Sequence, residues 1–236
     1  MDNTLIKQLA ELAIACQHHA VKPIICGGLG VYLSFCRKEG EIRQMIRATQ
    51  DIDLMFCRQD LLEEAKRKAM AEIITEKLDY VVQEDKKHHG FRKDPGQELD
   101  ILVPPIKELP QKNYRLRIVE STLHGHITSE AEFIDEDLRE IALSDIEKDC
   151  PEGDKVKLYV PCPTNFMIMK LYAFKDRIAG ARHDLDRAIA HAFDVYIIIM
   201  LTDIDDFKEG QKFVSRHKQS DILHKTKQIV EHYFSK

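Results

Sequence analysis

The 236-residue chain has no tryptophan, and aromatic residues make up only 7% of it. It also lacks an apolar run near the ~20 residues that span a bilayer, because its longest strongly apolar segment is Val195–Leu201. The first residues, Met1–Gln8, include an early Asp2 and no apolar stretch followed by a small-residue cleavage site. These absences predict a cytoplasmic protein without a membrane partner.

The six cysteines lack the close spacing that disulfide frameworks and zinc sites use, since no CxxC pair occurs. Disulfide frameworks belong mainly to small secreted chains, and zinc sites need close pairs of ligands. We therefore expect reduced, packed thiols.

The charges show no excess of basic residues: 35 Lys and Arg against 40 Asp and Glu give a net charge of −5. A general nucleic-acid coat protein would be basic, so this class is excluded, although a local basic groove is not. Hydrophobic residues at 44% and charged residues at 32% are typical of a folded, soluble chain of one or two domains.

The hydrophobic pattern changes near two prolines, Pro161 and Pro163. Before them the pattern predicts short strands among helices, with strands at about 23–26, 51–57, 80–82, 99–103 and 156–160, further sheet within 114–128, and helices at about 4–20, 29–35 and 61–77. After them it predicts helices at about 164–179, 184–201, 204–215 and 219–234. We therefore predict an α/β domain over residues 1–160 and a helical domain over residues 161–236.

A glycine pair and two aspartates in the first domain fit one kind of chemistry. Gly27 and Gly28 lie between a strand and a helix, where backbone can approach a ligand and helical N–H groups suit phosphate. Asp51 and Asp53 lie on one face of a strand by its two-residue period, and paired carboxylates favour Mg²⁺. An ordinary turn and a solvated strand end are the alternative interpretations.

Asp100 is a third candidate carboxylate, since it lies inside the apolar strand Leu99–Val103. An unpaired charge there is costly, so we expect its burial to be compensated by a cation. Together with Asp51 and Asp53 it would form a carboxylate triad for metal ions in phosphoryl transfer. The alternative is an ion pair with a nearby Arg or Lys.

These residues resemble a known signature. Gly27-Gly28 followed by Arg47-Ala48-Thr49-Gln50-Asp51-Ile52-Asp53-Leu54 is similar to the motif of polymerase-beta-like nucleotidyltransferases, specifically the AbiEii type of abortive-infection proteins. Lys170–Arg177 resembles the Lys-x-x-Ala-x-x-x-Arg helix of that family, and the segments around Asp184 and Asp194 resemble its Asp-containing helix. The resemblance extends over about residues 20–200.

The resemblance implies a fold, a metal and roles for the matched residues. The fold would be a mixed sheet with flanking helices, followed by helices, and the cofactor would be Mg²⁺ held by Asp51, Asp53 and Asp100. Asp100 would also act as base toward the acceptor. The nucleotide-binding residues would be Gly27, Gly28, Arg47, Thr49, Lys170, Arg177 and Asp184 or Asp194. The motif departs from the family in its last acid, because a compact Lys-Asp-x-x-Asp run is replaced by Asp184, Asp186 and a distant Asp194.

The implied function is transfer of a nucleoside monophosphate from an NTP to an acceptor such as tRNA, by the toxin of a phage-defence toxin–antitoxin pair with an antitoxin partner. Lys170 and Arg177, two helical turns apart, would present cations to the triphosphate. Three basic segments, 66–68, 86–93 and 112–117, would guide an RNA acceptor or another phosphate-bearing substrate. Solvated charges are the alternative for both. The alternative functions are a nucleotide- or partner-binding protein without turnover, and a small-molecule transferase of the aminoglycoside kind.

Overall fold

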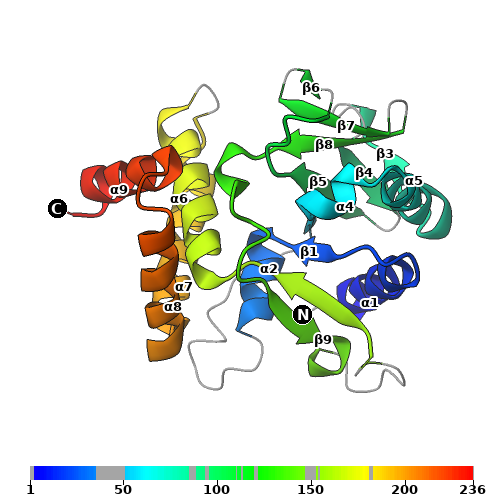
Figure 1. The fold of residues 1–236 in the computed structure, drawn as a ribbon, viewed down its shortest axis with the longest axis horizontal. Coiled ribbons are helices and arrows are strands. Elements are labelled where there is room, and N and C mark those ends of the chain that lie inside the picture. The colour runs from blue at the N-terminus through cyan, green and yellow to red at the C-terminus, as the bar shows by residue number, and fades with distance from the viewer. Residues whose placement is uncertain are drawn as a thin grey trace. The chain divides into compact units, whose positions relative to one another are not determined.

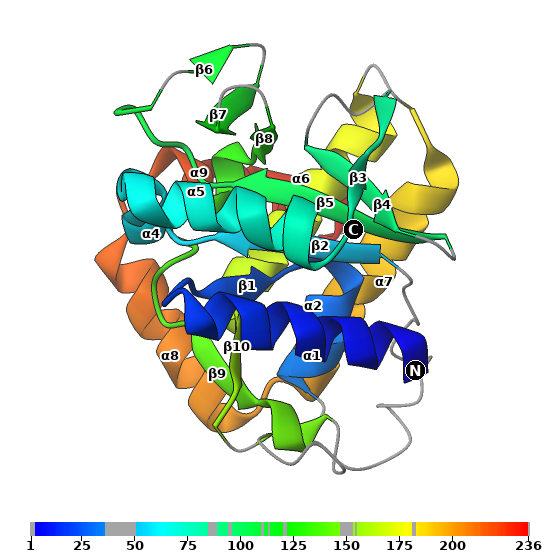
Figure 2. The same ribbon diagram turned by 90° about the vertical axis from the view of Figure 1, so that its right-hand side faces the viewer.

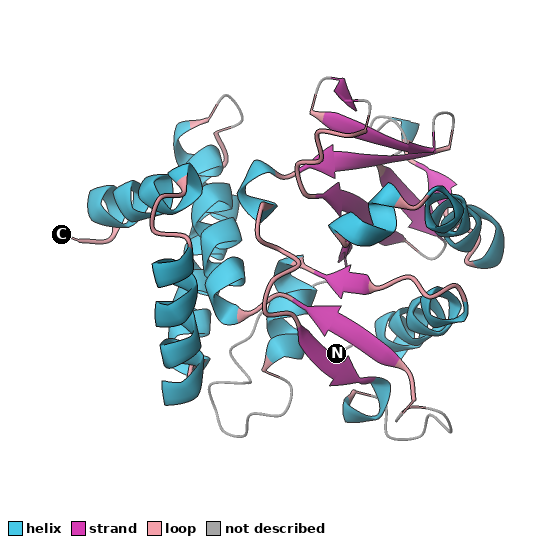
Figure 3. Cartoon of the chain, in the orientation of Figure 1, coloured by secondary structure: helices cyan, strands magenta, loops and turns pink. Residues whose placement is uncertain are grey.

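The computed structural model describes residues 3–35, 51–84, 89–93, 96–109, 111–112, 114–119, 122–146, 153, 155–180 and 183–235. The described residues divide into two compact units, the first ending at Pro161 and the second beginning at Cys162. Residues 47–50 of the signature lie outside the described residues, and they include the predicted nucleotide-binding residues Arg47 and Thr49. The ribbon is shown in Figure 1 and its secondary structure in Figure 3.

The first unit is built on one mixed sheet, whose main path runs in the order β6-β7-β8-β5-β2-β1-β10-β9. β4 pairs with β5 and β3 pairs with β4. The strands are β1 (Pro23–Ile25), β2 (Asp51–Phe56), β3 (Val81–Val82), β4 (Gly90–Lys93), β5 (Gln97–Val103), β6 (Gln111–Lys112), β7 (Arg115–Val119), β8 (Leu123–Ile127), β9 (Arg139–Ala142) and β10 (Lys157–Val160). β2 and β5 are parallel, as are β5 and β8.

Helices cover this sheet on both sides. α1 (Asn3–His18) and α5 (Glu64–Glu72) lie on the same side in Figures 1 and 2, and α2 (Gly27–Ser34) lies on the other side of β1 and β10 from α1 (Figure 1). The remaining short helices are α4 (Arg58–Leu62), the π-helical turn η1 (Ile73–Lys77), and the 3₁₀ turns η3 (Ser129–Ala131) and η4 (Leu143–Asp145). Alternate residues of β5 are buried, as the two-residue period of a strand with one accessible face requires.

The second unit is helical and consists of α6 (Pro163–Ala179), α7 (Leu185–Leu201), α8 (Ile204–Arg216) and α9 (Asp221–Tyr233). Pro163 opens α6 at a position where its missing N–H has no cost. Asp203 caps α8 by accepting from the N–H groups of Asp205 and Asp206. The apolar core of the unit contains Leu171, Phe174, Ala188, Val195 and Ile229.

The predicted mixed α/β architecture with flanking and following helices is confirmed, and the segmentation differs at several elements, including β4 and β6, which had no sequence prediction. The helix expected over 61–77 is divided into α4, α5 and η1, since Glu63 between α4 and α5 has an extended backbone. The strand β9 had no sequence prediction. Its residues Arg139–Ala142 contain no long apolar run, and their strand character comes from pairing with β10.

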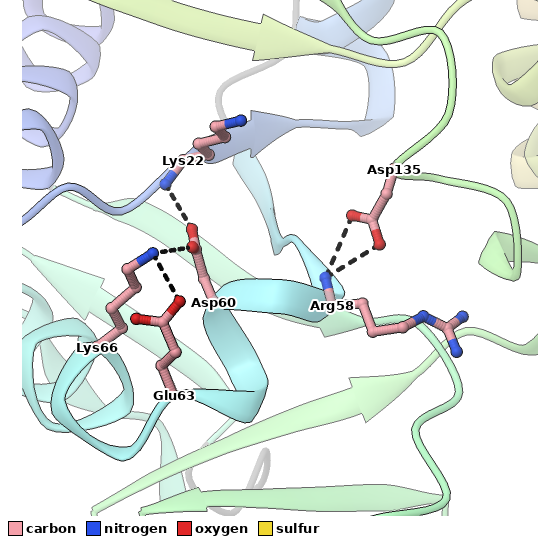
Figure 4. Close-up of polar contacts among 6 residues, drawn as sticks. All are labelled: Lys22, Arg58, Asp60, Glu63, Lys66 and Asp135. Atoms are coloured by element: carbon pink, nitrogen blue, oxygen red, sulfur yellow. Dashed lines mark hydrogen bonds and ion pairs between the residues drawn. The ribbon is translucent and has the colours of Figure 1, made fainter.

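A polar network holds α4 in place (Figure 4). The buried carboxylate of Asp60 accepts from the Lys22 backbone N–H at 2.8 Å and from the Lys66 ammonium at 2.6 Å. At the first residue of the helix, Asp135 accepts from the Arg58 backbone N–H at 3.0 and 3.2 Å. Burial raises the pKa of Asp135, and the Arg58 N–H opposes that shift. α4 is therefore capped by a residue 77 positions further along the chain.

The cysteines within the described residues are buried and form no disulfide with one another: Cys16, Cys26, Cys57 and Cys162. Burial raises the pKa of both Cys16 and Cys57 to about 12, so these thiols stay protonated near neutral pH. In the part of the chain that the structure describes, every helix is too short or too polar to cross a membrane.

Candidate active site

Strand register brings four carboxylates onto one face of the sheet. β2 and β5 are parallel neighbours, with Asp53 directly opposite Asp100 and Asp51 directly opposite Glu98. The residues between them, Ile52 and Leu99, are also paired and are buried on the other face. The acid row is defined here as Asp51, Asp53, Glu98 and Asp100. Side chains directly opposite on adjacent strands lie close enough to act on one ligand.

The acid row occupies the more accessible face of the two strands. Asp51 is exposed and Asp53 is half-buried, and on β5 both Glu98 and Asp100 are half-buried while Leu99 and Ile101 are fully buried. The expectation of a buried Asp100 is therefore wrong. The flanking apolar residues point to the opposite face, so they do not enclose the carboxylate.

Gly27 is packed directly against Asp53. Its φ is +63°, and a Cβ added to it would lie 1.8 Å from the Asp53 Oδ2 atom. The preceding residue, Cys26, donates its backbone N–H to the Asp53 carbonyl oxygen at 2.7 Å. Only glycine both adopts this backbone conformation without strain and leaves room for the Asp53 carboxylate. The turn between β1 and α2 thus holds one carboxylate of the acid row against the start of a helix.

The start of α2 supplies backbone N–H groups beside that carboxylate. The helix begins at Gly27, two residues earlier than the predicted start at Leu29. The first intrahelical bond at this end runs from the Gly30 N–H to the Cys26 carbonyl oxygen at 2.8 Å. The N–H groups of Gly27, Gly28 and Leu29 precede it and have no helical acceptor. A helix N-terminus of this kind is suited to phosphate.

The acid row fits Mg²⁺ as a hard cation that binds oxygen. Asp53 and Asp100 supply carboxylate oxygens, and the absence of a Cβ at Gly27 makes room for the Asp53 carboxylate. Within the described residues, no three His, Cys, Asp or Glu side chains converge into a ready-made metal site. Mg²⁺ commonly completes its shell with water and substrate phosphates. Its binding by Asp51, Asp53 and Asp100 stays a prediction.

In the second unit, Lys170 and Asp194 form a buried ion pair. The Lys170 Nζ lies 2.6 Å from the Asp194 Oδ2, and the two side chains are only 7% and 5% exposed. Lys170 is thus not a solvated surface cation, which was the alternative interpretation. The pair joins α6 to α7 within the unit. Contact of Lys170 with a triphosphate stays a prediction.

The other predicted residues of the helical half have different surroundings. Asp184 is the N-cap of α7, where its side chain accepts from the Arg187 backbone N–H at 3.0 Å. Arg177 lies in the last turn of α6 and is half-buried. Of the two candidate acids, Asp194 is therefore the partner of Lys170, and Asp184 has a capping contact. A nucleotide contact by Asp184, Asp194 or Arg177 stays a prediction.

Glu98 is the acid-row member that the sequence favoured less than Asp100, because it was expected at the entrance of the strand, nearer solvent. The alternation in Gln97-Glu98-Leu99-Asp100-Ile101 places Glu98 on the same face as Asp100. The missing information was the register between β2 and β5, which sets Glu98 opposite Asp51.

Comparisons with known proteins give two structural similarities. A scan against protein-family models finds no match, and a search of the curated proteins finds none. The solution structure of the antibiotic-resistance factor ANT(2'')-Ia superposes with a TM-score of 0.46. The match has 17% sequence identity and covers 95% of this chain and 98% of that chain. An antigenic nucleotidyltransferase-like protein from Paracoccidioides brasiliensis is 12% identical, with a TM-score of 0.46 over 96% of this chain and 93% of that chain. These values carry no argument about function, which has to come from the site itself.

Proposed function

We propose that the chain is a nucleotidyltransferase that moves a nucleoside monophosphate from an NTP to a hydroxyl group of an acceptor. One observation carries the proposal: Asp53 and Asp100 face each other across parallel strands, and Gly27 holds the start of α2 against Asp53. Carboxylates and the N–H groups of a helix's first turn at one place suit a phosphate ligand with its cation.

The reaction assigns a separate task to each part of this site. The acceptor oxygen forms a bond to the α-phosphorus, the bond from that phosphorus to the bridging oxygen breaks, and pyrophosphate leaves with the electron pair. Asp100 takes the proton from the acceptor hydroxyl, and the N–H groups at Gly27 and Gly28 hold phosphate oxygens. Catalysis is then mainly positioning and charge stabilisation.

Asp51, Asp53 and Asp100 would hold Mg²⁺, which when bound neutralises phosphate charge and polarises the phosphoryl group. Asp53 has the most defined place among them, because the Gly27 contact fixes its carboxylate.

A finer proposal concerns the biological role. The segment Arg47–Leu54 and the Lys170–Arg177 helix resemble the AbiEii type, and this resemblance supports a toxin that modifies tRNA and is neutralised by an antitoxin. Growth arrest on expression of the wild-type chain, abolished by Asp53→Asn, is the expected outcome. Normal growth with the wild-type chain at equal protein level would contradict the toxin role.

The transfer reaction is tested by following the phosphorus atoms of the NTP. The protein is incubated with each NTP labelled at the α- or γ-phosphate, with Mg²⁺ and total RNA, and pyrophosphate release is measured separately. We expect the α label in RNA, the γ label in pyrophosphate, and a loss of at least about 100-fold in Asp53→Asn. The matched control is Asp205→Asn, which removes an exposed carboxylate from α8.

The outcomes separate the alternative functions. An α label found only on an added small molecule such as an aminoglycoside would identify a small-molecule transferase and contradict the RNA acceptor. Bound Mg-NTP without pyrophosphate release for any acceptor would identify a binding protein and contradict the proposed activity.

A further inference from the structure

A second polar strip lies on the antiparallel pair β7–β8 of the first unit. Arg115 is directly opposite His126, and Arg117 is directly opposite His124. The alternating residues Leu116, Ile118, Leu123 and Gly125 are buried on the other face. The basic strip is defined here as Arg115, Arg117, His124 and His126. Its members are half-buried, apart from His126, which is exposed.

The basic strip is on the same face of the sheet as the acid row. His126 pairs in register with Leu102 of the parallel strand β5, and Leu102 shares its strand face with Asp100. Asp100 in turn is opposite Asp53. The strands follow in the order β7-β8-β5-β2, and β7, β8 and β5 can be followed side by side in Figure 1. At about 4.8 Å per strand, the strip begins roughly 5 Å from the strand of Asp100.

The basic strip comes near Asp100 at the point where β4 and β8 pair with successive parts of one edge of β5. β4 pairs with that edge up to Asp100, which is opposite Gly90, and β8 pairs with it from Leu102 onward. The imidazole of His89, just before β4, lies with its centroid 5.7 Å from that of His126. Gly90 contributes no side chain opposite Asp100, and the two imidazoles in ring contact come from the residue before β4 and from β8.

This arrangement has the chemistry of a phosphate site. Two guanidinium groups and two imidazoles lie directly opposite one another on one face of adjacent strands, so an anion there would meet several nitrogen donors. Guanidinium groups bind phosphate oxygens in pairs and remain charged at all ordinary pH values. A polycationic acceptor such as an aminoglycoside would meet like charges here.

We propose that Arg115, Arg117, His124 and His126 bind a phosphate group carried by the acceptor, an inference that rests on the nucleotidyl transfer proposed above. The acceptor then lies across β8 with its phosphate on the strip and its hydroxyl at Asp100. The same arginine and histidine side chains could also bind a phosphate of the NTP. The second measurement below therefore distinguishes a phosphate of the acceptor from one of the NTP.

The first measurement uses inorganic phosphate as the probe. Imidazole resonances of His124 and His126 are followed by NMR during phosphate titration of the wild-type chain and of Arg115→Gln/Arg117→Gln. We expect saturable shifts in the wild type and affinity at least about tenfold weaker in the double variant. The control Lys225→Gln/Lys227→Gln removes two charges from exposed positions on α9 and should keep its affinity. Equal affinity in both double variants would overturn the strip as a phosphate site.

The second measurement separates the two sources of phosphate. Binding of Mg²⁺ with α,β-methylene-ATP should be unchanged in Arg115→Gln/Arg117→Gln, because the nucleotide is held at Gly27 and the acid row. If the double variant lost as much affinity for α,β-methylene-ATP as for inorganic phosphate, the assignment of the phosphate to the acceptor would be overturned. If the double variant is unfolded by circular dichroism, His126→Gln at an exposed position replaces it, with a smaller but measurable loss expected.

Phosphate binding is measured without turnover, so the two proposals fail separately. Strip-dependent phosphate binding in a protein that transfers no nucleotide would contradict the proposed function alone. Active transfer with strip-independent phosphate binding would contradict the strip alone.

Discussion

Gly27 is the residue whose replacement most directly tests the acid row. Gly27→Ala introduces a Cβ 1.8 Å from the Asp53 Oδ2 atom at a φ of +63°, so the carboxylate has to move. We expect nucleotidyl transfer to fall at least about 100-fold. Transfer rates and urea unfolding of the same preparation check this.

Gly96→Ala is the matched control for that change. Gly96 has a φ of +82°, but an added Cβ would meet no atom within 4 Å. Its cost is therefore only the backbone strain of about 1–2 kcal/mol, which Gly27→Ala shares. An equally small effect of both substitutions on transfer would show that the Asp53 position does not matter.

The Lys170–Asp194 pair makes a separate prediction about stability. Lys170→Met leaves the buried Asp194 carboxylate without its cation, so we expect about 3–5 kcal/mol less free energy of unfolding. Adding Asp194→Leu should restore most of that loss, since no unpaired charge remains. Urea denaturation of the four members of this double-mutant cycle measures the coupling.

The exposed pair of Lys208 and Asp205 provides the control. Lys208→Met should change the free energy of unfolding by less than about 1 kcal/mol. A similarly small change in Lys170→Met would mean that the α6–α7 pair does not stabilise the unit.

At the scale of elements, α4 shows how a short helix depends on distant residues. It has five residues, and its N-cap Cys57 makes no side-chain capping bond. Asp135 replaces that cap and Asp60 ties the helix to Lys22 before β1. A helix of this length is not stable alone, so these contacts determine whether it forms.

Asp60→Ala tests that dependence. The substitution removes the carboxylate that accepts from the Lys22 N–H and lies closest to the Lys66 ammonium. We therefore expect the free energy of unfolding to fall by about 1–3 kcal/mol and hydrogen exchange at the Lys22 amide to become faster. Glu63 is the other partner of Lys66, and its side chain is half exposed. Glu63→Ala should therefore lower the free energy of unfolding by less than about 1 kcal/mol. An unchanged rate of hydrogen exchange at the Lys22 amide in Asp60→Ala would contradict the proposed role of this hydrogen bond in holding α4.

At the scale of the whole molecule, Mg²⁺ should alter thermal stability through the acid row. A ligand that binds only the folded state raises Tm, so Mg²⁺ should raise it in the wild type more than in Asp53→Asn or Asp100→Asn. Without Mg²⁺ the variants should be as stable as the wild type or slightly more so, because one repelling charge is gone. Calorimetry with and without Mg²⁺ measures both effects. The same Mg²⁺-dependent shift in all three proteins would remove the acid row as the binding site.

Local sequence signals predicted most of the elements. Pro163 and Asp203 mark the starts of α6 and α8, and alternation predicts β5, because these signals act within a few residues. β9 was missed because its strand conformation depends on β10.

The candidate site was predicted only in part for the same reason. The faces of Asp51, Asp53 and Asp100 follow from strand periodicity. Their register, which sets Asp53 against Asp100 and adds Glu98, is decided by packing between segments far apart in the sequence. The ion pair of Lys170 likewise depends on how α6 packs on α7.

The pairing of β1 has a consequence for the order of synthesis. Ile24 is paired in register with Met55 of β2 on one edge and with Tyr159 of β10, which is translated much later, on the other. A nascent chain that ends before β10 leaves one edge of this buried strand open, and open edges promote aggregation. The ribosome therefore releases nearly the entire first unit before this inner strand has both neighbours, and its open edge is exposed during that interval.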